Sequence, residues 1–472
     1  MAQQSFVFDG TTAISTVPFF WTASWNNKWL PYVSFWNGNV AGPHSADIRL
    51  TGSDWGMHVI RFAGDGGIKA TFTDATSGAN RQIQMIQLSE AGGQINLDIT
   101  QVDEILSNDD GNTVIKTTRH HIKSIDLSDG DDRVTIGNGA NYIDLGGGKN
   151  SLTVRGADSN VHYVSGYQGR NTISVEGEAR IFAVKLDDGV NSFTTKAGFT
   201  ESFTSHNGVN TLNIGTGGIG SIQFFGDGDK LQVVKAAGWV GSLKVGDDQR
   251  IQLTLGAGGA DMVQLGRGAD VVTTGAGWVG YMATSDGNDV VNIGPGGIDT
   301  LRLSKGNDIA KLRGALTDDT GISGGNGIDT LDLSDVAGNG VRVDLSNSNW
   351  QKFSAAAGLL RVSGIEVLIG TDKADTLEGD NANNTLTGGK GNDRLIGNDG
   401  ADTFRFGRAT GTDRILDFEL REDRIAFSGA SSLSSLKFSQ SGDDVRVSFG
   451  ESVVFVEDVT VSQLRVAANF IF

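Results

Sequence analysis

The chain contains no cysteine among its 472 residues and only four prolines. Without cysteine, disulfides cannot stabilise the fold and thiol chemistry is impossible. No window reaches eighteen apolar residues, so we expect no transmembrane helix. Basic residues are also few, because 38 Lys and Arg stand against 56 Asp and Glu. The resulting net charge of −18 argues against nucleic acid or an anionic lipid surface as the partner.

Catalytic motifs are scarce as well. None of the six histidines lies in a His-Glu-x-x-His motif, so the sequence excludes a zinc protease of that type. Residues 321–325 fit the Gly-x-Ser-x-Gly pattern of hydrolases, but they lie inside a repeat and not between a strand and a helix. We therefore expect no enzyme. The alternative is a secreted polysaccharide-active enzyme, a lyase or epimerase on a β-helix, using Asp, Lys, Arg or Tyr from scattered coils.

Glycine is abundant, at 68 residues, and its spacing is strictest in residues 370–405. This stretch divides into four nonapeptides: GTDKADTLE, GDNANNTLT, GGKGNDRLI and GNDGADTFR. The third matches the Gly-Gly-x-Gly-x-Asp-x-U-x repeat in full, where U is a large apolar residue. Position six holds an acid or amide and position eight an apolar side chain, namely Asp375, Asn384, Asp393 and Asp402 with Leu377, Leu386, Leu395 and Phe404.

Each part of the nonapeptide has a physical reason. Glycines allow backbone angles that turn several carbonyl groups toward one point. The carboxylate adds a hard oxygen ligand suited to calcium, and the x-U-x triplet forms a short strand with one inward side chain. Side chains eighteen residues apart then stack, with a cation between successive loops. The predicted calcium ligands are Asp372, Asp375, Asn384, Gly388, Gly389, Gly391, Asp393, Asp399, Gly400 and Asp402.

A second, looser repeat of about twenty residues precedes the strict one. Its polar positions are residues 150, 171, 191, 210, 229, 249, 270, 289, 308 and 329. Two strands per coil of this length predict a β-solenoid. Stacked Asn side chains can hydrogen-bond one another without a metal, whereas stacked Asp side chains repel unless a cation separates them. We therefore expect the Asn half to be largely metal-free and calcium to bind at Asp261, Asp270, Asp289, Asp299, Asp308 and Asp329. The alternative is that all are ordinary polar turn residues.

These repeats resemble the calcium-binding β-roll of RTX (hemolysin-type) proteins. The segment at Asp413, Asp417 and Asp423 resembles the stretch directly after the β-roll in serralysin-type C-terminal domains. The resemblance implies calcium as the cofactor and export by a type I secretion machinery through an uncleaved C-terminal signal. In agreement, residues 1–15 have neither a basic n-region nor an apolar h-region. We expect an extracellular or cell-surface protein without a cleaved N-terminal signal peptide.

The first 122 residues differ in composition, because five of the eight tryptophans lie in the first 55. Flat aromatic rings suit either a compact core or a surface that contacts protein or carbohydrate. We expect contacts from Trp21, Trp25, Trp29 and Trp36.

Together these patterns predict an all-β protein: a parallel β-solenoid that passes into strict nine-residue repeats, preceded by an N-terminal β-rich domain. The expected segments are 1–122 (Trp-rich cap), 123–335 (degenerate solenoid), 336–369 (connecting β segment), 370–405 (calcium β-roll) and 406–472 (C-terminal β cap with the secretion signal). The expected function is a calcium-binding structural protein of the cell surface, of the S-layer, matrix or adhesion type. Its expected partner is another copy of itself or a cell-surface glycan.

Overall fold

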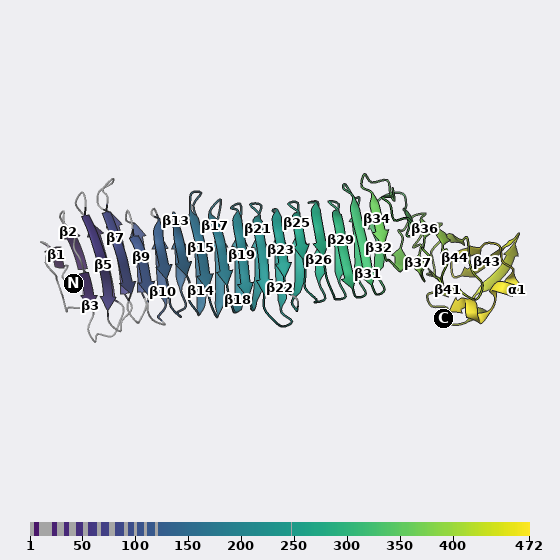
Figure 1. Ribbon diagram of the computed structural model, residues 1–472, viewed down its shortest axis with the longest axis horizontal. Helices are drawn as coiled ribbons and strands as arrows, with labels where there is room; N and C mark the ends of the chain where they lie inside the picture. Colours follow the sequence, from purple (N-terminus) through teal and green to yellow (C-terminus); the bar gives the residue numbers. More distant parts are fainter. Residues whose placement is uncertain are drawn as a thin grey trace. The chain divides into compact units, whose positions relative to one another are not determined.

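The computed structural model is all-β (Figure 1). It describes residues 4–8, 21–25, 33–36, 44–50, 55–63, 68–74, 81–88, 93–98, 102–107, 111–118, 121–246 and 248–472, and in most strands before residue 83 it describes the backbone alone. The chain divides into two compact units, Met1–Trp239 and Val240–Phe472. The predicted fold class, a parallel β-solenoid with coils of roughly twenty residues, is confirmed in each unit.

The first unit stacks its coils through two parallel sheets, with one strand of each coil in each sheet. The first sheet contains β3 (Val33–Trp36), β5 (Trp55–Ala63), β7 (Arg81–Leu88), β9 (Val102–Ser107), β11 (Ile122–Asp126), β13 (Gly139–Asp144), β15 (Asn160–Gly166), β17 (Arg180–Leu186), β19 (Thr200–His206) and β21 (Ile219–Phe225). The second contains β4 (His44–Leu50), β6 (Ile68–Asp74), β8 (Gly93–Asp98), β10 (Thr113–Thr117), β12 (Arg133–Ile136), β14 (Lys149–Val154), β16 (Arg170–Val175), β18 (Gly189–Thr195), β20 (Gly208–Ile214) and β22 (Leu231–Ala236). In addition, β1 (Gln4–Phe8) pairs with β2 (Trp21–Trp25).

Apolar side chains from the two sheets fill the interior of each coil. Ile143 of β13 and Leu152 of β14 are fully buried, and their partners one coil further on, Val164 and Ile173, are equally buried. Because the pairing is parallel and in register, each inward position repeats every coil and forms a continuous apolar column. Burial of these columns accounts for the twenty-residue period of large apolar residues.

Parallel pairing continues through residue 122 without a break, since β9 pairs with β11 and β7 with β9. The described strands before this point therefore use the same coil geometry as those after it. The proposed contact residues lie outside the described part of the chain: Trp29 entirely, and Trp21, Trp25 and Trp36 in their side chains. Their role stays a prediction, as do the segment boundaries.

The second unit is also built from parallel sheets, and its strands become shorter in the nonapeptide region. One sheet contains β23 (Val240–Val245), β25 (Ala260–Gln264), β27 (Val279–Ala283), β29 (Ile298–Lys305), β31 (Thr320–Asn326) and β34 (Leu360–Ser363). The facing sheet contains β24 (Arg250–Leu255), β26 (Val271–Thr273), β28 (Val290–Ile293), β30 (Ile309–Gly314), β32 (Thr330–Val336), β35 (Val367–Ile369), β37 (Thr385–Thr387), β39 (Thr403–Phe406), β41 (Arg424–Phe427) and β45 (Phe470–Ile471).

A third sheet covers the nonapeptide region of the second unit. It contains β33 (Arg342–Asp344), β36 (Thr376–Glu378), β38 (Arg394–Ile396), β40 (Thr412–Ile415), β44 (Ser452–Val456), β43 (Asp444–Phe449) and β42 (Lys437–Ser441), the last two being antiparallel. The three-residue strands β36, β37 and β38 each bury one leucine, as the nonapeptide predicts.

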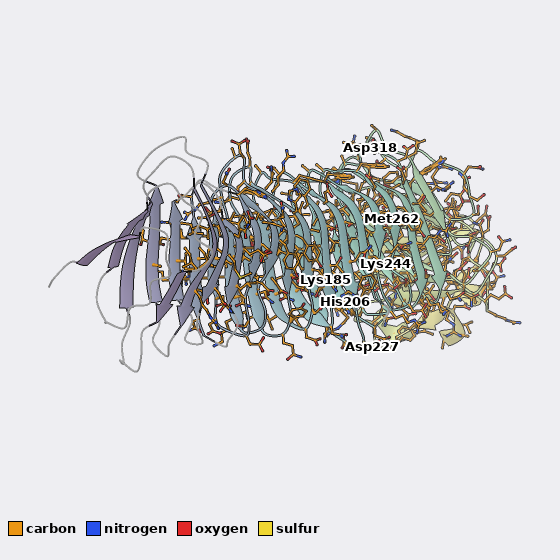
Figure 2. The ribbon with its side chains drawn as sticks, turned by 60° about the vertical axis from the view of Figure 1, so that its left-hand side comes forward. Lys185, His206, Asp227, Lys244, Met262 and Asp318 are labelled. Atoms are coloured by element: carbon orange, nitrogen blue, oxygen red, sulfur yellow. The ribbon has the colours of Figure 1, made fainter. Side chains whose placement is uncertain are left out.

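Helix is almost absent from the described residues, where α1 (Val461–Leu464) has four residues. None of the helices described there has the length and apolar character needed to cross a bilayer. Side chains at outward-facing strand positions are exposed to solvent. Figure 2 labels examples, including Lys185 of β17 and His206 of β19 in the first unit, and Lys244 of β23 and Met262 of β25 in the second.

Candidate metal centre

Four aspartates of the second unit form a column at the starts of neighbouring strands. Each precedes a strand of the facing sheet and is at most 1% exposed: Asp270, Asp289, Asp308 and Asp329. The parallel register places them one strand spacing apart, about 4.8 Å. The backbone N–H of each of the first three aspartates donates to Oδ1 of the next aspartate. The distances are 2.8 Å from Asp270 to Asp289, 2.7 Å from Asp289 to Asp308 and 2.9 Å from Asp308 to Asp329.

The second carboxylate oxygen of each column member is the unusual feature. Oδ2 is buried and has no hydrogen-bond partner in Asp270, Asp289, Asp308 or Asp329. Burial raises the pKa of Asp270 to about 8, of Asp308 to about 7 and of Asp289 to about 6, although backbone donors oppose the rise. A buried ionised carboxylate with half its acceptors unpaired is costly. The column therefore requires either protons or a cation.

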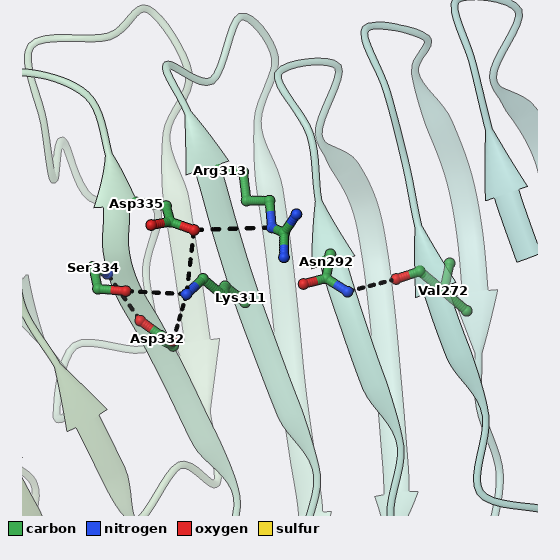
Figure 3. A network of polar contacts seen from close by, with 7 residues as sticks. All are labelled: Val272, Asn292, Lys311, Arg313, Asp332, Ser334 and Asp335. Carbon is green, nitrogen blue, oxygen red and sulfur yellow. Dashed lines mark hydrogen bonds and ion pairs between the residues drawn. The ribbon is translucent and has the colours of Figure 1, made fainter. Parts of the chain in front are cut away.

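Carboxylates on the outer face of the same coils have partners. Lys311 Nζ lies 3.1 Å from Asp332 Oδ2 and 3.2 Å from Asp335 Oδ2, as Figure 3 shows. Burial raises the pKa of Asp332, but hydrogen bonds from Ser334 and Lys311 outweigh it and leave that pKa below its ordinary value. Asp329, three residues away, has its pKa raised by burial. The buried Asp329 Oδ2 without a partner thus contrasts with the paired carboxylates of Asp332 and Asp335 on the strand that follows it.

The nonapeptides build two further columns of the same kind. In one, the backbone N–H of Asp375 donates to Asp393 Oδ1 at 2.9 Å, and that of Asp393 donates to Asp413 Oδ1 at 3.1 Å. In the other, the N–H of Asn384 donates to Asp402 Oδ1 at 2.7 Å, and that of Asp402 to Asp423 Oδ1 at 2.9 Å. Oδ2 of Asp393, Asp402 and Asp413 is buried without a partner.

Burial also raises the pKa values of these carboxyls, to about 7 for Asp393 and Asp402 and to about 6 for Asp413. Neighbouring carboxylates within each column add to the rise for Asp393 and Asp402. Asp375 differs, because its Oδ2 accepts from the N–H of Thr371 at 2.5 Å. The pattern in Asp393 and Asp402 matches the longer-period column: Oδ1 accepts from the backbone of the preceding coil, and Oδ2 has no partner.

Glycines leave the space that these carboxylates use. A Cβ at Gly388 would lie 2.2 Å from Asp393 Oδ2, so only glycine accommodates the carboxylate there. Gly389 and Gly391 have φ of 105° and 137°, a left-handed region that other residues avoid. A Cβ on them would lie 2.0 Å from the carbonyl oxygen of Thr371 and 2.4 Å from that of Lys373. Gly400, with φ of 119°, similarly approaches a carbonyl of the loop before it.

Four predicted ligands lie away from the buried columns. Asp372 and Asp399 are exposed at loop tips, and Asp372 forms an ion pair with Lys390. Asp261 and Asp299 are exposed on the outer face of the first sheet of this unit, in β25 and β29. The structure therefore brings the position-six residues together and leaves these four apart from them.

Sequence reasoning missed several members of the columns. Glu366 ends the longer-period column, because its Oε2 accepts from the N–H of Asp329 at 2.8 Å. Asp413 and Asp423 end the two nonapeptide columns. Asp132 of the first unit also has a buried, unpartnered Oδ2, and burial raises its pKa to about 6. The sequence does contain a signal for this residue, because Asp132 occupies position six of the nonapeptide LSDGDDRVT.

The first unit fills the equivalent positions with amides. Asn150 Nδ2 donates to Asn171 Oδ1 at 3.2 Å, Asn171 to Asn191 at 3.0 Å and Asn191 to Asn210 at 3.1 Å. Asn210 Nδ2 then donates to Gln232 Oε1 at 2.9 Å, so Gln232 continues this column where residue 229 was predicted. The expected hydrogen-bonded Asn ladder is present.

No three His, Cys, Asp or Glu side chains in the described part of the chain gather closely enough to hold a metal by themselves. Each column supplies one carboxylate per coil, so other ligands would be backbone carbonyl groups of the loops. Unpaired buried carboxylate oxygens and nearby backbone carbonyl groups form an all-oxygen donor set. The glycines leave the space between them open because they have no Cβ. That chemistry fits a hard cation, and calcium in particular.

Comparison with known proteins agrees with this geometry. The chain matches the family of RTX calcium-binding nonapeptide repeats in four copies, over residues 255–278, 362–392, 369–404 and 378–412. The chain therefore carries RTX calcium-binding nonapeptide repeats on a β-solenoid, as the resemblance implied, and calcium is the ion that such repeats bind.

No curated protein matches the chain. Among solved structures, the chain is similar to the extracellular lipase LipA from Serratia marcescens, with 17% sequence identity over 46% of this chain and a TM-score of 0.16. The similarity spans 40% of the lipase chain.

Proposed function

We propose that the chain is an extracellular, calcium-binding structural protein of the cell surface, of the S-layer, matrix or adhesion type. The observation that carries the proposal is the set of buried carboxylate columns with an unpartnered Oδ2. Calcium would be held by Asp393 and Asp402 with carbonyl groups of the glycine loops, and by Asp270, Asp289 and Asp308 in the longer-period coils. The ion supplies the positive charge that lets these carboxylates stay ionised inside the coils.

Calcium binding would couple folding to location. Extracellular modules bind calcium with dissociation constants of about 10⁻⁴ to 10⁻³ M. At roughly ten times that concentration, each site stabilises the folded chain by about 1.4 kcal/mol. Four to eight sites would then contribute on the order of 5–10 kcal/mol, comparable with the stability of a whole domain. Inside a cell, where calcium is scarce, the calcium-dependent coils of the second unit would remain unfolded and ready for export.

Export is proposed to use a type I machinery that recognises the C-terminal segment, residues 406–472. Support comes from the RTX repeats and from the serralysin-like sequence after them. In the structure this segment contributes β40, β44 and the antiparallel pair β43–β42, which extend the third sheet beyond the last nonapeptide strand. The segment would thus serve as signal before folding and as a cap afterwards.

The proposed role is structural and not catalytic. A cavity of about 510 Å³ lies in the second unit, lined mainly by Phe406, Phe427, Phe472 and small residues. Arg405 is the one charged residue among the described residues that line it, and none of them is a carboxylate. An acid–base pair of the kind that a polysaccharide lyase or epimerase needs is thus not offered by this cavity.

Assembly tests the proposal directly. The full-length protein should form ordered arrays or filaments when calcium is added, visible by electron microscopy, and should return to single molecules with a chelator. A full-length variant with Trp21, Trp25, Trp29 and Trp36 all replaced by Ala should lose assembly while its calcium-induced folding persists. Monomers at every calcium concentration would contradict the structural role, and normal assembly of the variant would move the contact away from these tryptophans.

A further inference from the structure

One row of residues on the outer face of the second unit consists of charged residues and glycines. Between the register pairs of β25, β27 and β29 lie Asp261, Gly280 and Asp299, and Gly321 of β31 pairs directly with Arg361 of β34. A Cβ at Gly321 would lie 2.7 Å from the Asp299 carbonyl oxygen, which places it next to Asp299 on the neighbouring strand. Charged residues and glycines therefore alternate along five adjacent strands.

An indole ring lies against each glycine in this row. A Cβ at Gly280 would lie 2.8 Å from Cη2 of Trp278, so the ring rests against the bare backbone there. The Trp278 Nε1 donates to Asp299 Oδ1 at 2.8 Å, which fixes the ring's position. A Cβ at Gly321 would lie 3.5 Å from Cη2 of Trp350.

Trp350 is held from a second direction by a cation. Arg361 places its guanidinium carbon 4.6 Å from the centre of the Trp350 ring. Trp350 is nevertheless 39% exposed and Trp278 is 43% exposed. Two indoles with fixed positions thus remain open to solvent. We call Trp278, Trp350 and the row beneath them, residues 261, 280, 299, 321 and 361, the tryptophan ledge.

We propose that the tryptophan ledge binds an extended, neutral β-linked glycan. Indole faces stack on the apolar faces of sugar rings, because both are flat and weakly hydrated. Gly280 on β27 and Gly321 on β31, against which the two rings lie, are two strand spacings apart, about 10 Å. This distance is close to the two-sugar repeat of an extended β-1,4-linked glycan. Alternate sugars of such a chain present the same face, so one chain can reach both rings.

The polar groups of the ledge select a neutral glycan. Asp261 and Asp299 are exposed carboxylates beside the rings, and carboxylates accept hydrogen bonds from sugar hydroxyls. An anionic glycan would meet these carboxylates and the net charge of −18. The single cation of the row, Arg361, already stacks on Trp350. The ledge deepens the proposed surface role by assigning a partner class and a site, and it rests on that role only for placing the protein outside the cell.

Binding can be measured by titration calorimetry on the full-length, calcium-loaded protein. The probes are cellohexaose and chitohexaose, with an oligogalacturonate as the anionic comparison. We expect at least one neutral hexasaccharide to bind, and Trp278→Ala or Trp350→Ala to weaken its affinity by roughly five- to tenfold. Gly280→Ala should weaken it too, because the new Cβ displaces the Trp278 ring.

The control is Tyr167→Ala, which removes an aromatic side chain that is 51% exposed and lies in the first unit, outside the tryptophan ledge. It should leave the affinity unchanged. Failure of both neutral probes to bind, binding of the anionic probe alone, or equal weakening by Tyr167→Ala would each overturn the proposal. So would ledge variants that change only self-association in sedimentation. Circular dichroism of the same samples reports calcium-induced folding separately, so a failed ledge leaves the calcium proposal standing.

Discussion

The Asn column of the first unit and the Asp column of the second occupy the same place in their coils and solve the same problem differently. Asn171 offers Nδ2 to the coil after it and Oδ1 to the coil before it. Asp289 offers Oδ1 to the backbone of the coil before it and leaves Oδ2 buried with no partner. An amide is both donor and acceptor, whereas a carboxylate accepts only.

Replacing NH₂ by O⁻ at one repeated position therefore changes what holds the coils together. The amide column is complete with the chain's own atoms. The carboxylate column is complete only when something else supplies positive charge or a proton, because a buried unpaired acceptor costs about 1–3 kcal/mol and a charged one costs more. One solenoid geometry thus yields one region that should be independent of calcium and another that should depend on it.

The largest expected effect follows from removing calcium. We expect a chelator to unfold or loosen the second unit while the Asn-bearing coils of the first unit keep their strands. Hydrogen exchange read by mass spectrometry on the full chain separates the two regions. Peptides covering residues 370–405 should lose protection, and peptides covering residues 150–214 should keep it. Unchanged protection of both regions in chelator would refute the calcium requirement.

A paired substitution sharpens the comparison. Asp393→Ala removes a carboxylate that accepts from Asp375 and has an unpaired oxygen, so we expect it to weaken calcium binding cooperatively across the nonapeptides. Asn191→Ala breaks two hydrogen bonds of the amide column and should destabilise the first unit by about 1–3 kcal/mol. It should leave the calcium dependence nearly untouched, as followed by calcium titration with circular dichroism. Equal shifts of the calcium midpoint in both variants would show that the two columns do not differ.

Much of this comparison could be predicted from the sequence. The twenty-residue period and the nonapeptide fix which residues face inward, because parallel pairing in register repeats each position every coil. Position six is therefore predictable at Asp289 and Asp393. Gln232 was not, because it lies in register with Asn210 but twenty-two residues after it, so a fixed twenty-residue period points to a residue of the preceding loop.

Other parts of the site depend on three-dimensional packing that a period does not encode. Asp299 has the residue type of a column member, yet it lies on an outward strand position and accepts from Trp278. Trp350 reaches Gly321 only because residues 345–359 form a loop that returns the chain to the wall before β34. A local repeat gives no information about such returns, which is why the tryptophan ledge was not predicted.

A smaller effect is expected from pH. Folded-state pKa values of about 8 for Asp270 and about 7 for Asp308 lie above the ordinary value of 3.8, so the folded chain holds protons that the unfolded chain releases. Without calcium, stability should therefore be greatest near pH 4 and fall as pH rises toward 8. In chelator, the melting temperature should be higher at pH 6 than at pH 8.

Two variants identify the groups responsible for this pH dependence. Asp308→Asn should flatten it, because it removes one raised pKa. Asp332→Asn, which removes a carboxyl whose pKa is lowered, should not flatten it. A melting temperature that rises from pH 6 to pH 8 in chelator would contradict the assignment.

The smallest change converts one Asp position into the chemistry of the other column. Asp289→Asn keeps an oxygen to accept from the Asp270 N–H and adds an NH₂ group where Oδ2 has no partner. In the amide column the corresponding NH₂ donates to the next coil, so we expect this one to donate to Asp308. In chelator we expect a gain in stability of about 1 kcal/mol, measured by urea unfolding. In saturating calcium we expect a loss, because one ligand oxygen is gone. The sign should thus reverse with calcium, whereas Asn191→Asp, its mirror in the first unit, should destabilise the chain in chelator. A gain or loss of the same sign in both conditions for Asp289→Asn would mean that this column binds no calcium.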